Sequence, residues 1–422
     1  MMVNYLPRIA DRVLAKKLEA FGAVYIAGPK WCGKTSTAEQ QAKSMLYLQD
    51  SDALKSNMHI ADTKPSLLLN GEKPRLLDEW QVAPVLWDAV RFAVDKTQNL
   101  GEYILTGSAV TKDGSTMHTG TGRISRMTMR TMSLFESKES NGQVSLAALF
   151  DGDLDIEGIS ALTIERLAFV ITRGGWPKAV NMKKEDIALL QANEYVDAII
   201  NTDASKIDET QRDPVRVRSL MRSLARNVST QANLSTLRAD MRGEEEVLSE
   251  DTISNYIAAL SKLYVIEDLR AWNPSIRSKT AVRTSPTRHF VDPSIASAVL
   301  NLNHVGLLKD FNTFGLLFES LCVRDLRVYA EAIDAQVFHY RDKSGLEADA
   351  VVQMKNGRWG AIEIKMGANA ADAGAANLLK LRQTIDTKKM NEPSFLMVLT
   401  AGQYAYRCKD GVLIVPIGCL KD

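Results

Sequence analysis

The sequence has few residues that would form covalent or metal cross-links, and it has no excess of charge of either sign. Its 422 residues include four cysteines, Cys32, Cys322, Cys408 and Cys419, which form no CxxC pair and have no clustered histidines near them. A disulfide framework and a zinc site are therefore not expected. The formal net charge is +1, so a nucleic-acid partner would have to be recognised by a local patch.

Long apolar runs are missing as well. No stretch approaches the roughly 18 apolar residues of a membrane helix. The N-terminal segment MMVNYLPRIADRVLAKKLEAFG carries charges at helical spacing and lacks the apolar core of a signal peptide. We therefore expect a cytoplasmic protein with no membrane partner. What the chain does have is a hydrophobic content of 45% and enough length for two or three domains.

A glycine-rich segment near the N-terminus has the pattern of a nucleotide phosphate-binding loop. The apolar run AVYIA at 23–27 is typical of a buried parallel strand, and KTSTAEQQAKSML has helical composition. Between them, GPKWCGKT matches G-x-x-x-x-G-K-[ST], a pattern in which the backbone wraps around phosphates at the start of a helix. The alternative is a chance glycine-rich turn. We predict that ATP is bound by Gly28, Pro29, Lys30, Trp31, Cys32, Gly33, Lys34, Thr35 and Ser36.

An acidic pair downstream is the expected complement of this loop. Lys34 is predicted to reach the β- and γ-phosphates, and Thr35 to bind Mg²⁺. The segment PRLLDEWQ at 74–81 is an apolar strand that ends in Asp78 and Glu79. We predict that Asp78 is the carboxylate on the metal side and that Glu79 polarises the attacking water. Without the loop, the same pair would be read as a solvated strand end.

A third strand and the arginines after it could complete the site. EYILTGSAV at 102–110 turns polar at Thr106 and Ser108, where a hydroxyl could hold the attacking water or sense the γ-phosphate. A simple Thr-Gly-Ser turn fits the same residues equally well. Arg123 or Arg126 is predicted to act as an arginine finger, either within the subunit or from a neighbour in a homo-oligomer. Ordinary surface arginines are the alternative.

The middle of the chain is predicted to be helical. From about residue 155 to 210, apolar residues recur at three- and four-residue spacing. An arginine-rich helix, a shorter helix and a longer helix beginning near Ser249 follow, which is the order of a winged helix-turn-helix. The extended segment 270–290 is basic and contains no acid, so DNA contact is favoured over a solvated surface or a protein interface. The predicted DNA-binding residues are Arg277, Lys279, Arg283 and Arg288.

The last part of the chain places carboxylates at intervals typical of a metal-dependent nuclease. Glu319 lies on a predicted helix, Asp349 in a strand, and Glu363 and Lys365 two residues apart on one face of another strand. Such carboxylates can bind Mg²⁺ or Mn²⁺, with the lysine stabilising the charge of a phosphoryl transition state. The order E…D…E-x-K resembles the PD-(D/E)xK fold of restriction-endonuclease-like proteins, without the proline of that motif. A solvated E-x-K strand is the alternative.

The order of motifs along the chain resembles one known family. YLPRIAD, GPKWCGKT, LLDEWQ, YILTGSA, GRISRM…RTMSLFES and RGGWPKAV together resemble prokaryotic AAA-type ATPases that carry an uncharacterised C-terminal domain with a nuclease-like core. The resemblance covers essentially the whole chain and implies an ATPase module, but no substrate. The expected fold is an α/β P-loop ATPase domain at 1–150, a helical lid or linker at 151–210, a winged-helix-like domain at 211–300 and an α/β PD-(D/E)xK nuclease-like domain at 301–422.

Two functions remain open at this stage. The first is an ATPase that acts on DNA as a remodelling motor, assembled as a homo-oligomer, with Mg²⁺-dependent cleavage by the C-terminal domain left open. The second is a nucleotide-dependent regulatory switch, in which the nuclease-like domain is a non-catalytic binding platform. Stimulation of ATP hydrolysis by DNA would distinguish them, because phosphate contacts release counterions and depend steeply on salt.

Overall fold

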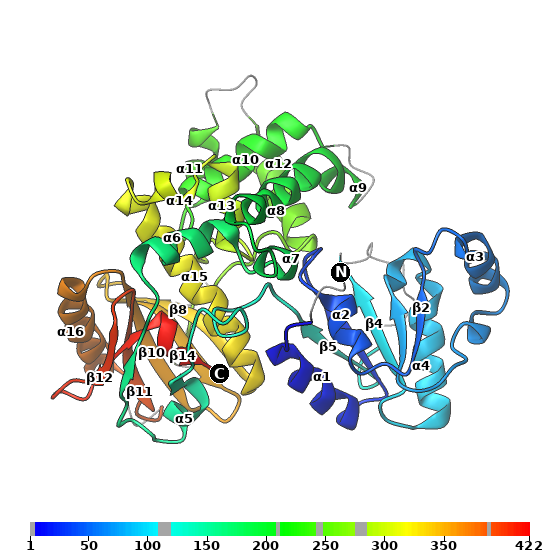
Figure 1. The fold of residues 1–422 in the computed structure, drawn as a ribbon, viewed down its shortest axis with the longest axis horizontal. Helices are drawn as coiled ribbons and strands as arrows, with labels where there is room; N and C mark the ends of the chain where they lie inside the picture. The colour runs from blue at the N-terminus through cyan, green and yellow to red at the C-terminus, as the bar shows by residue number, and fades with distance from the viewer. Residues whose placement is uncertain (1–4, 109–119, 208–211, 242–247, 275–284, 386–389) are drawn as a thin grey trace. The chain divides into compact units, whose positions relative to one another are not determined.

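The structure is a computed structural model in which the chain divides into two compact units (Figure 1). The N-terminal unit comprises Met1–Thr131 with Ser205–Gln211 and Lys262–Tyr264. The C-terminal unit comprises the remaining segments, Met132–Ala204, Arg212–Ser261 and Val265–Asp422. The residues that the structure describes are 5–108, 120–207, 212–241, 248–274, 285–385 and 390–422. Among them, no helix is long and apolar enough to cross a membrane.

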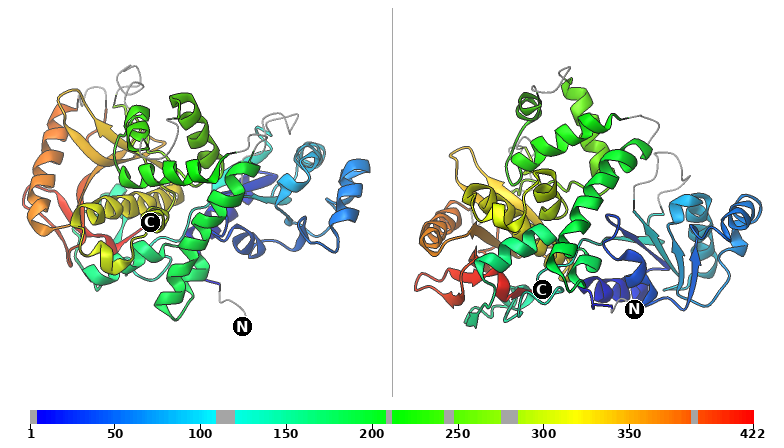
Figure 2. Two further views of the ribbon diagram at one scale, coloured as in Figure 1. Left: turned by 90° about the horizontal axis from the view of Figure 1, so that it is seen from above. Right: turned by 45° about the horizontal axis from the view of Figure 1, so that its top comes forward.

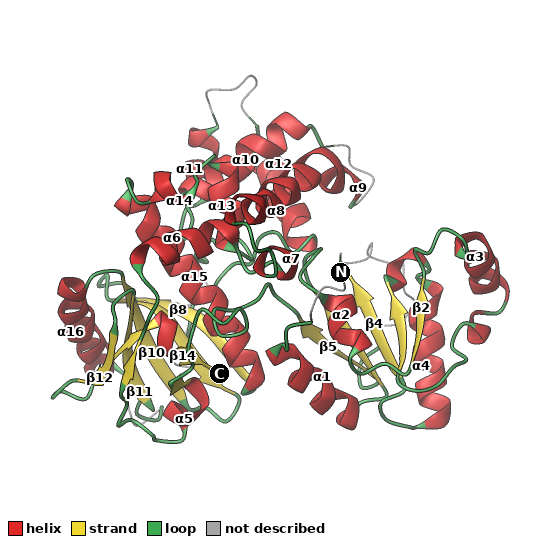
Figure 3. Ribbon diagram, viewed as in Figure 1, coloured by secondary structure: helices red, strands yellow, loops and turns green. Residues whose placement is uncertain are grey.

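The N-terminal unit is built on a five-stranded parallel sheet with helices on both faces (Figure 3). Its strand order is β2-β3-β4-β1-β5. Because all neighbouring strands are parallel, the C-terminal ends of the five strands lie along one edge of the sheet. The strands are β1 (Ala23–Ala27), β2 (Ser44–Tyr47), β3 (Arg75–Asp78), β4 (Tyr103–Gly107) and β5 (Ile124–Thr128). The helices are α1 (Ile9–Ala20), α2 (Lys34–Glu39), α3 (Leu54–Thr63), η1 (Pro65–Leu67), η2 (Trp80–Val82) and α4 (Val85–Thr97).

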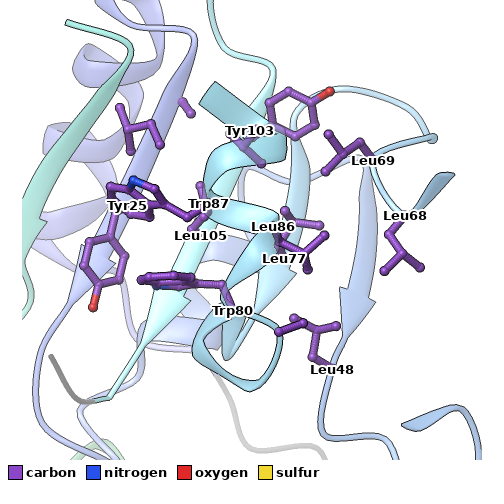
Figure 4. Packing of buried hydrophobic residues seen from close by; sticks show 14 of the residues in the cluster. Tyr25, Leu48, Leu68, Leu69, Leu77, Trp80, Leu86, Trp87, Tyr103 and Leu105 are labelled. Carbon is purple, nitrogen blue, oxygen red and sulfur yellow. The ribbon is translucent and has the colours of Figure 1, made fainter. Parts of the chain in front are cut away.

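Side chains alternate across the central strand β1 into two cores. Val24 and Ile26 pack in one core with residues of α1 and α2. Tyr25 packs in the other with residues of α3 and α4, where Trp80 and Trp87 lie edge-on to its ring (Figure 4). Because β1 is buried on both faces and flanked by β4 and β5, the loop that follows it starts from a rigid strand end.

The C-terminal unit contains a seven-stranded mixed sheet in the order β7-β12-β13-β11-β10-β9-β8. Helix α16 (Ala368–Thr384) packs along β9, β10 and β11 (Figure 2), and α15 (Phe311–Ala332) contacts β8, β9 and β10. The strands are β7 (Gly158–Ile159), β8 (Ala335–Arg341), β9 (Glu347–Met354), β10 (Trp359–Lys365), β11 (Phe395–Thr400), β12 (Tyr404–Arg407) and β13 (Leu413–Pro416).

Helices fill the part of the chain between β7 and α15. Asn233 and Ser249 act as N-caps of the second and third helices in the predicted winged-helix region. Antiparallel bridges Ile266↔Phe290 and Leu269↔Thr287 join the two sides of the extended segment that follows. The helices are α6 (Ile164–Arg173), α7 (Pro177–Val180), α8 (Glu185–Ala198), η3 (Ile199–Asp203), α9 (Ala204–Lys206), α10 (Pro214–Arg226), α11 (Leu234–Asp240), α12 (Glu250–Lys262), α13 (Pro293–Val299) and α14 (His304–Leu307).

The segment after Thr131 does not pack where the sequence places it. We expected the ATPase domain to extend to residue 150, but residues 132–150 belong to the C-terminal unit. There, β6 (Val144–Ser145) pairs with β14 (Leu420–Lys421), α5 (Leu146–Phe150) follows, and β7 extends the seven-stranded sheet beside β12. These short strands pair with residues more than 200 positions away, so the local pattern of apolar residues could not predict them.

Candidate functional site

The predicted phosphate-binding loop connects the end of β1 to the start of α2. Gly28 and Gly33 have φ angles of +153° and +100°, in the region that favours glycine. A Cβ at Gly28 would lie 2.1 Å from the carbonyl oxygen of Met129, so any side chain there would collide with the backbone after β5. Both glycines of the motif are therefore required by the loop conformation itself. Pro29 and Lys30 lie within the loop, and Ser36 on the first turn of α2.

The lysine of the loop is folded back over the loop backbone. Lys34 is 4% exposed, and its Nζ donates to the carbonyl oxygens of Gly28 at 3.0 Å and Pro29 at 2.8 Å. A bound phosphate oxygen could replace these carbonyl oxygens as the acceptor of the ammonium group. Trp31 is 49% exposed, whereas Cys32 is fully buried with its Sγ against the Met129 carbonyl, so Cys32 fills the base of the loop and is no exposed nucleophile.

Three of the predicted residues meet beside the loop through hydroxyl–carboxylate contacts. The Thr35 and Thr106 hydroxyls both donate to Asp78 Oδ1, at 2.7 Å and 2.6 Å. This convergence follows from the strand order, because β4 lies between β1 and β3 and brings Thr106 next to Asp78. A hydroxyl and a carboxylate oxygen are hard ligands of the kind that Mg²⁺ takes together with water and phosphate. The donor set therefore fits the predicted Mg²⁺.

Glu79 is held in an unusual conformation at the tip of β3. Its φ and ψ of 55° and 48° are left-handed, which is uncommon for a residue with a side chain. Its backbone N–H donates to Thr106 Oγ1 at 3.1 Å. Its carboxylate Oε2 accepts from Ser108 Oγ at 3.2 Å and from Gln81 Nε2 through a short contact. Gln81 is a site residue that the sequence analysis missed, although it lies in the quoted LLDEWQ motif.

The two arginines chosen as fingers do not reach this edge of the sheet within the subunit. Arg123 precedes β5 and forms an ion pair with Asp95 at 2.6 Å, at the end of the sheet opposite the loop. Arg126 lies midway along β5, with its guanidinium over the ring of Trp87. Because β5 runs parallel to β1, its C-terminal end lies beside the start of the loop. In the segment that contains β5, only residues that follow Thr128 can therefore lie at this edge of the sheet. Among the three arginines of GRISRMTMR, Arg130 has that position.

The predicted DNA-binding residues lie mostly outside the described part of the chain. Arg277, Lys279 and Arg283 fall within 275–284, which the structure does not describe. Arg288 is described, and its side chain is 14% exposed and ion-paired with Asp268. Its guanidinium is therefore engaged within the protein.

The predicted E…D…E-x-K residues converge in the C-terminal unit around a lysine. Lys365 Nζ lies 2.5 Å from Glu363 Oε2 and 3.1 Å from Asp349 Oδ2, and the second oxygen of Glu363 accepts from Asn377 Nδ2 at 2.6 Å. The carboxylates come from β9 and β10, and Asn377 comes from α16. Asn377 was not predicted, because nothing in the local pattern distinguishes it from other polar residues of the helix.

Burial dominates the protonation of this cluster. It raises the pKa of Glu363 to about 7, with a further increase from the Asp349 charge that the Lys365 ammonium opposes. Burial, and then Asp349, also raises the pKa of Glu319 on α15 well above its usual range. Within the described residues, no group of three or more His, Cys, Asp or Glu side chains is placed to hold a metal ion. The predicted metal at Glu319, Asp349 and Glu363 stays a prediction.

Replacing Lys365 by methionine should destabilise the C-terminal unit more at high pH than at low pH. Folding favours protonated Glu363, so its contribution to stability is present below pH 4.5 and is lost as the pH rises through about 7. Near pH 8 the variant would leave buried carboxylates without this ammonium, at a cost of about 3 kcal/mol. Near pH 5 protonated Glu363 and Glu319 would make the loss smaller. Urea unfolding at both pH values measures the difference.

A matched control is Lys355→Met. The Lys355 ammonium lies 3.4 Å from Asp334, but its side chain is 78% exposed, so no measurable change is expected at either pH. Equal destabilisation of Lys365→Met at the two pH values would contradict the proposed role of carboxylate charge.

The comparisons with known proteins divide the chain into three matched regions. Residues 20–138 match the family model described as AAA domain. Residues 164–305 and 314–420 match two models described as domains of unknown function, DUF8612 and DUF4143. No curated protein matches the sequence. The structure of a Walker-type ATPase of Pyrococcus abyssi is 14% identical, with a TM-score of 0.44 over 71% of this chain and 100% of that chain.

A structural similarity at that level carries no argument about this chain. The AAA domain match, in contrast, spans both the loop and the strand that ends in Asp78. Together with the contacts of Thr35, Asp78 and Glu79, it supports an AAA-type P-loop ATPase at the N-terminal end of the chain.

Proposed function

We propose that the protein binds ATP with Mg²⁺ at Gly28–Ser36 and hydrolyses it with Glu79 as the group that activates water. The observation that carries the proposal is the contact between Thr35 and Asp78, at the point where the phosphate loop enters α2. It brings the two predicted metal-side oxygens together from β3 and α2, which are separated by more than 30 residues of sequence.

Each residue of the site has a distinct part in this proposal. Lys34 exchanges the carbonyls of Gly28 and Pro29 for oxygens of the β- and γ-phosphates, where its positive charge stabilises the transferred group. When bound, Mg²⁺ would neutralise phosphate charge beside Thr35 and Asp78. Both described side-chain contacts of the Glu79 carboxylate engage Oε2, which leaves Oε1 to accept the proton of the attacking water.

The finer part of the proposal is that ATP turnover acts on DNA. The segment 270–290 is basic and without acids, and antiparallel bridges at its base are what a two-stranded wing requires. The ion pair between Arg288 and Asp268 favours the second candidate, a nucleotide-dependent switch. In that case the C-terminal unit would be a binding platform for another partner.

DNA is expected to stimulate ATP hydrolysis, and raised salt should remove the stimulation steeply. Phosphate contacts release counterions, so affinity falls with increasing salt concentration. The measurement is the rate of phosphate release with and without duplex, single-stranded and four-way-junction DNA. The charge-reversal variant Arg277→Glu should lose stimulation but keep the basal rate.

A second readout of the same mixtures tests the C-terminal cluster. Incubation in Mg²⁺ and Mn²⁺ shows whether any of these DNAs is cut, and Asp349→Ala with Glu363→Ala shows whether the cluster is responsible. Stimulation without cutting favours DNA binding by a non-catalytic domain. No stimulation by any nucleic acid would favour the regulatory switch.

A further inference from the structure

The YLPRIAD motif has no role in the proposed chemistry, yet its residues contact the nucleotide site. The Tyr5 hydroxyl donates to Asp11 Oδ1 at 2.5 Å. The same hydroxyl lies 3.0 Å from Oγ1 of Thr37, a residue of α2, the helix that follows the phosphate loop. Asp11 in turn accepts from the Arg8 backbone N–H at 2.8 Å, so it caps the first turn of α1. These contacts fix the Arg8 backbone at the start of α1.

Arg8 joins the phosphate loop to the segment after β5. Its Nη1 donates to the Cys32 carbonyl at 2.8 Å, and its Nη2 donates to the Arg130 carbonyl at 2.9 Å. The residue is 6% exposed, so both contacts are made away from bulk water. The planar guanidinium has several donors in a rigid arrangement, which suits it to hold two carbonyls at once.

The contact with Cys32 sets the direction of a loop N–H group. In a planar trans peptide, the carbonyl of one residue and the N–H of the next point to opposite sides. Because buried Arg8 holds the Cys32 carbonyl, the Gly33 N–H is directed away from the buried side of the loop. Backbone N–H groups at that position are the donors with which such loops bind phosphate.

We propose that Arg8 is a positioning residue for ATP turnover, which fixes the Cys32–Gly33 peptide of the loop and the Arg130–Thr131 peptide after β5. The inference rests on the proposed ATPase function. Arg8 acts through the backbone of the loop and does not itself contact the nucleotide. The second carbonyl belongs to Arg130, which follows β5, and Arg8 thus connects the loop to the segment after β5.

The test compares Arg8→Ala, Arg8→Lys and a matched control, Arg12→Ala, which removes an exposed arginine from the same helix. We expect Arg8→Ala to raise the KM for ATP roughly tenfold, because two buried charge-assisted hydrogen bonds are lost. The kcat should fall by less, because the residues that act on water are unchanged. Arg8→Lys should lie between, since one ammonium cannot hold both carbonyls in the same geometry. Arg12→Ala should match the wild type.

Two measurements separate positioning from general stability. A fluorescent ADP analogue should bind more weakly to both Arg8 variants, and thermal unfolding shows how much of each remains folded. If Arg8→Ala does not fold, Arg8→Lys decides. Unfolding at lower temperature with unchanged KM and ADP affinity would overturn the inference and leave Arg8 a structural residue. Absence of ATP turnover in both wild type and Arg12→Ala would instead overturn the proposed function, and this inference with it.

Discussion

Lys34→Ala is expected to abolish ATP turnover, with a fall of at least about 100-fold in kcat/KM. The Lys34 ammonium is the buried cation of the loop that is placed to meet the phosphates, and it already contacts the two loop carbonyls beside them. Its removal leaves the negative charge of the transferred phosphoryl group without that partner in a site shielded from water. The measurement is phosphate release over a range of ATP concentrations, which gives kcat/KM, with binding of a fluorescent nucleotide followed in parallel.

The control for this variant is Lys55→Ala, an exposed lysine on α3 of the same unit. It changes the net charge equally and should keep the wild-type rate. Thermal unfolding of Lys34→Ala verifies that the loop variant is folded. Turnover by folded Lys34→Ala at the rate of Lys55→Ala would show that ATP is hydrolysed elsewhere.

Glu79→Gln should separate nucleotide binding from hydrolysis. The amide keeps the shape of the side chain but cannot accept the proton of the attacking water, so kcat is expected to fall by roughly 100-fold or more. Affinity for ATP should change little, since Lys34, Thr35 and Asp78 remain in place. Single-turnover hydrolysis and nucleotide binding together measure the two effects.

Glu72→Gln is the matched change at an exposed glutamate just before β3, and it should leave both quantities unaltered. A variant at Glu79 that binds ATP and hydrolyses it at the normal rate would remove Glu79 from the mechanism. A variant that loses binding as well as hydrolysis would point to a role of Glu79 in shaping the loop after β3, where its left-handed backbone already indicates local strain.

The strand, the loop and the helix of the candidate nucleotide site could be predicted from the sequence because their pattern is local. The strand, the glycine loop and the helix that carries Thr35 are contiguous, and Asp78 and Glu79 are neighbours at one strand end. For Arg123 and Arg126, an arginine finger within the subunit does not fit their places in the sheet, whereas a finger from a neighbouring subunit stays a prediction. Residues that precede or lie within a parallel strand cannot reach the edge where ligands bind, and only Arg130 follows the strand.

The C-terminal cluster shows the limit of that reasoning. The two-residue spacing of Glu363 and Lys365 predicted that both lie on one face, and the contact between them agrees. The spacing could not predict that Lys365 would lie between two carboxylates or that Asn377 would cap Glu363. These contacts depend on how β9, β10 and α16 are placed against one another.

The sequence by itself determined the strand–loop–helix with the phosphate-loop pattern and the acids at the end of a neighbouring strand, since short-range patterns encode both backbone conformation and residue chemistry. Only the tertiary structure decided which distant groups support that site. Gln81 and Ser108 meet on Glu79, and Arg8 connects Cys32 with Arg130. The physical reason is that strand order and register bring together residues far apart in the chain, and neither is written in the spacing of any one segment.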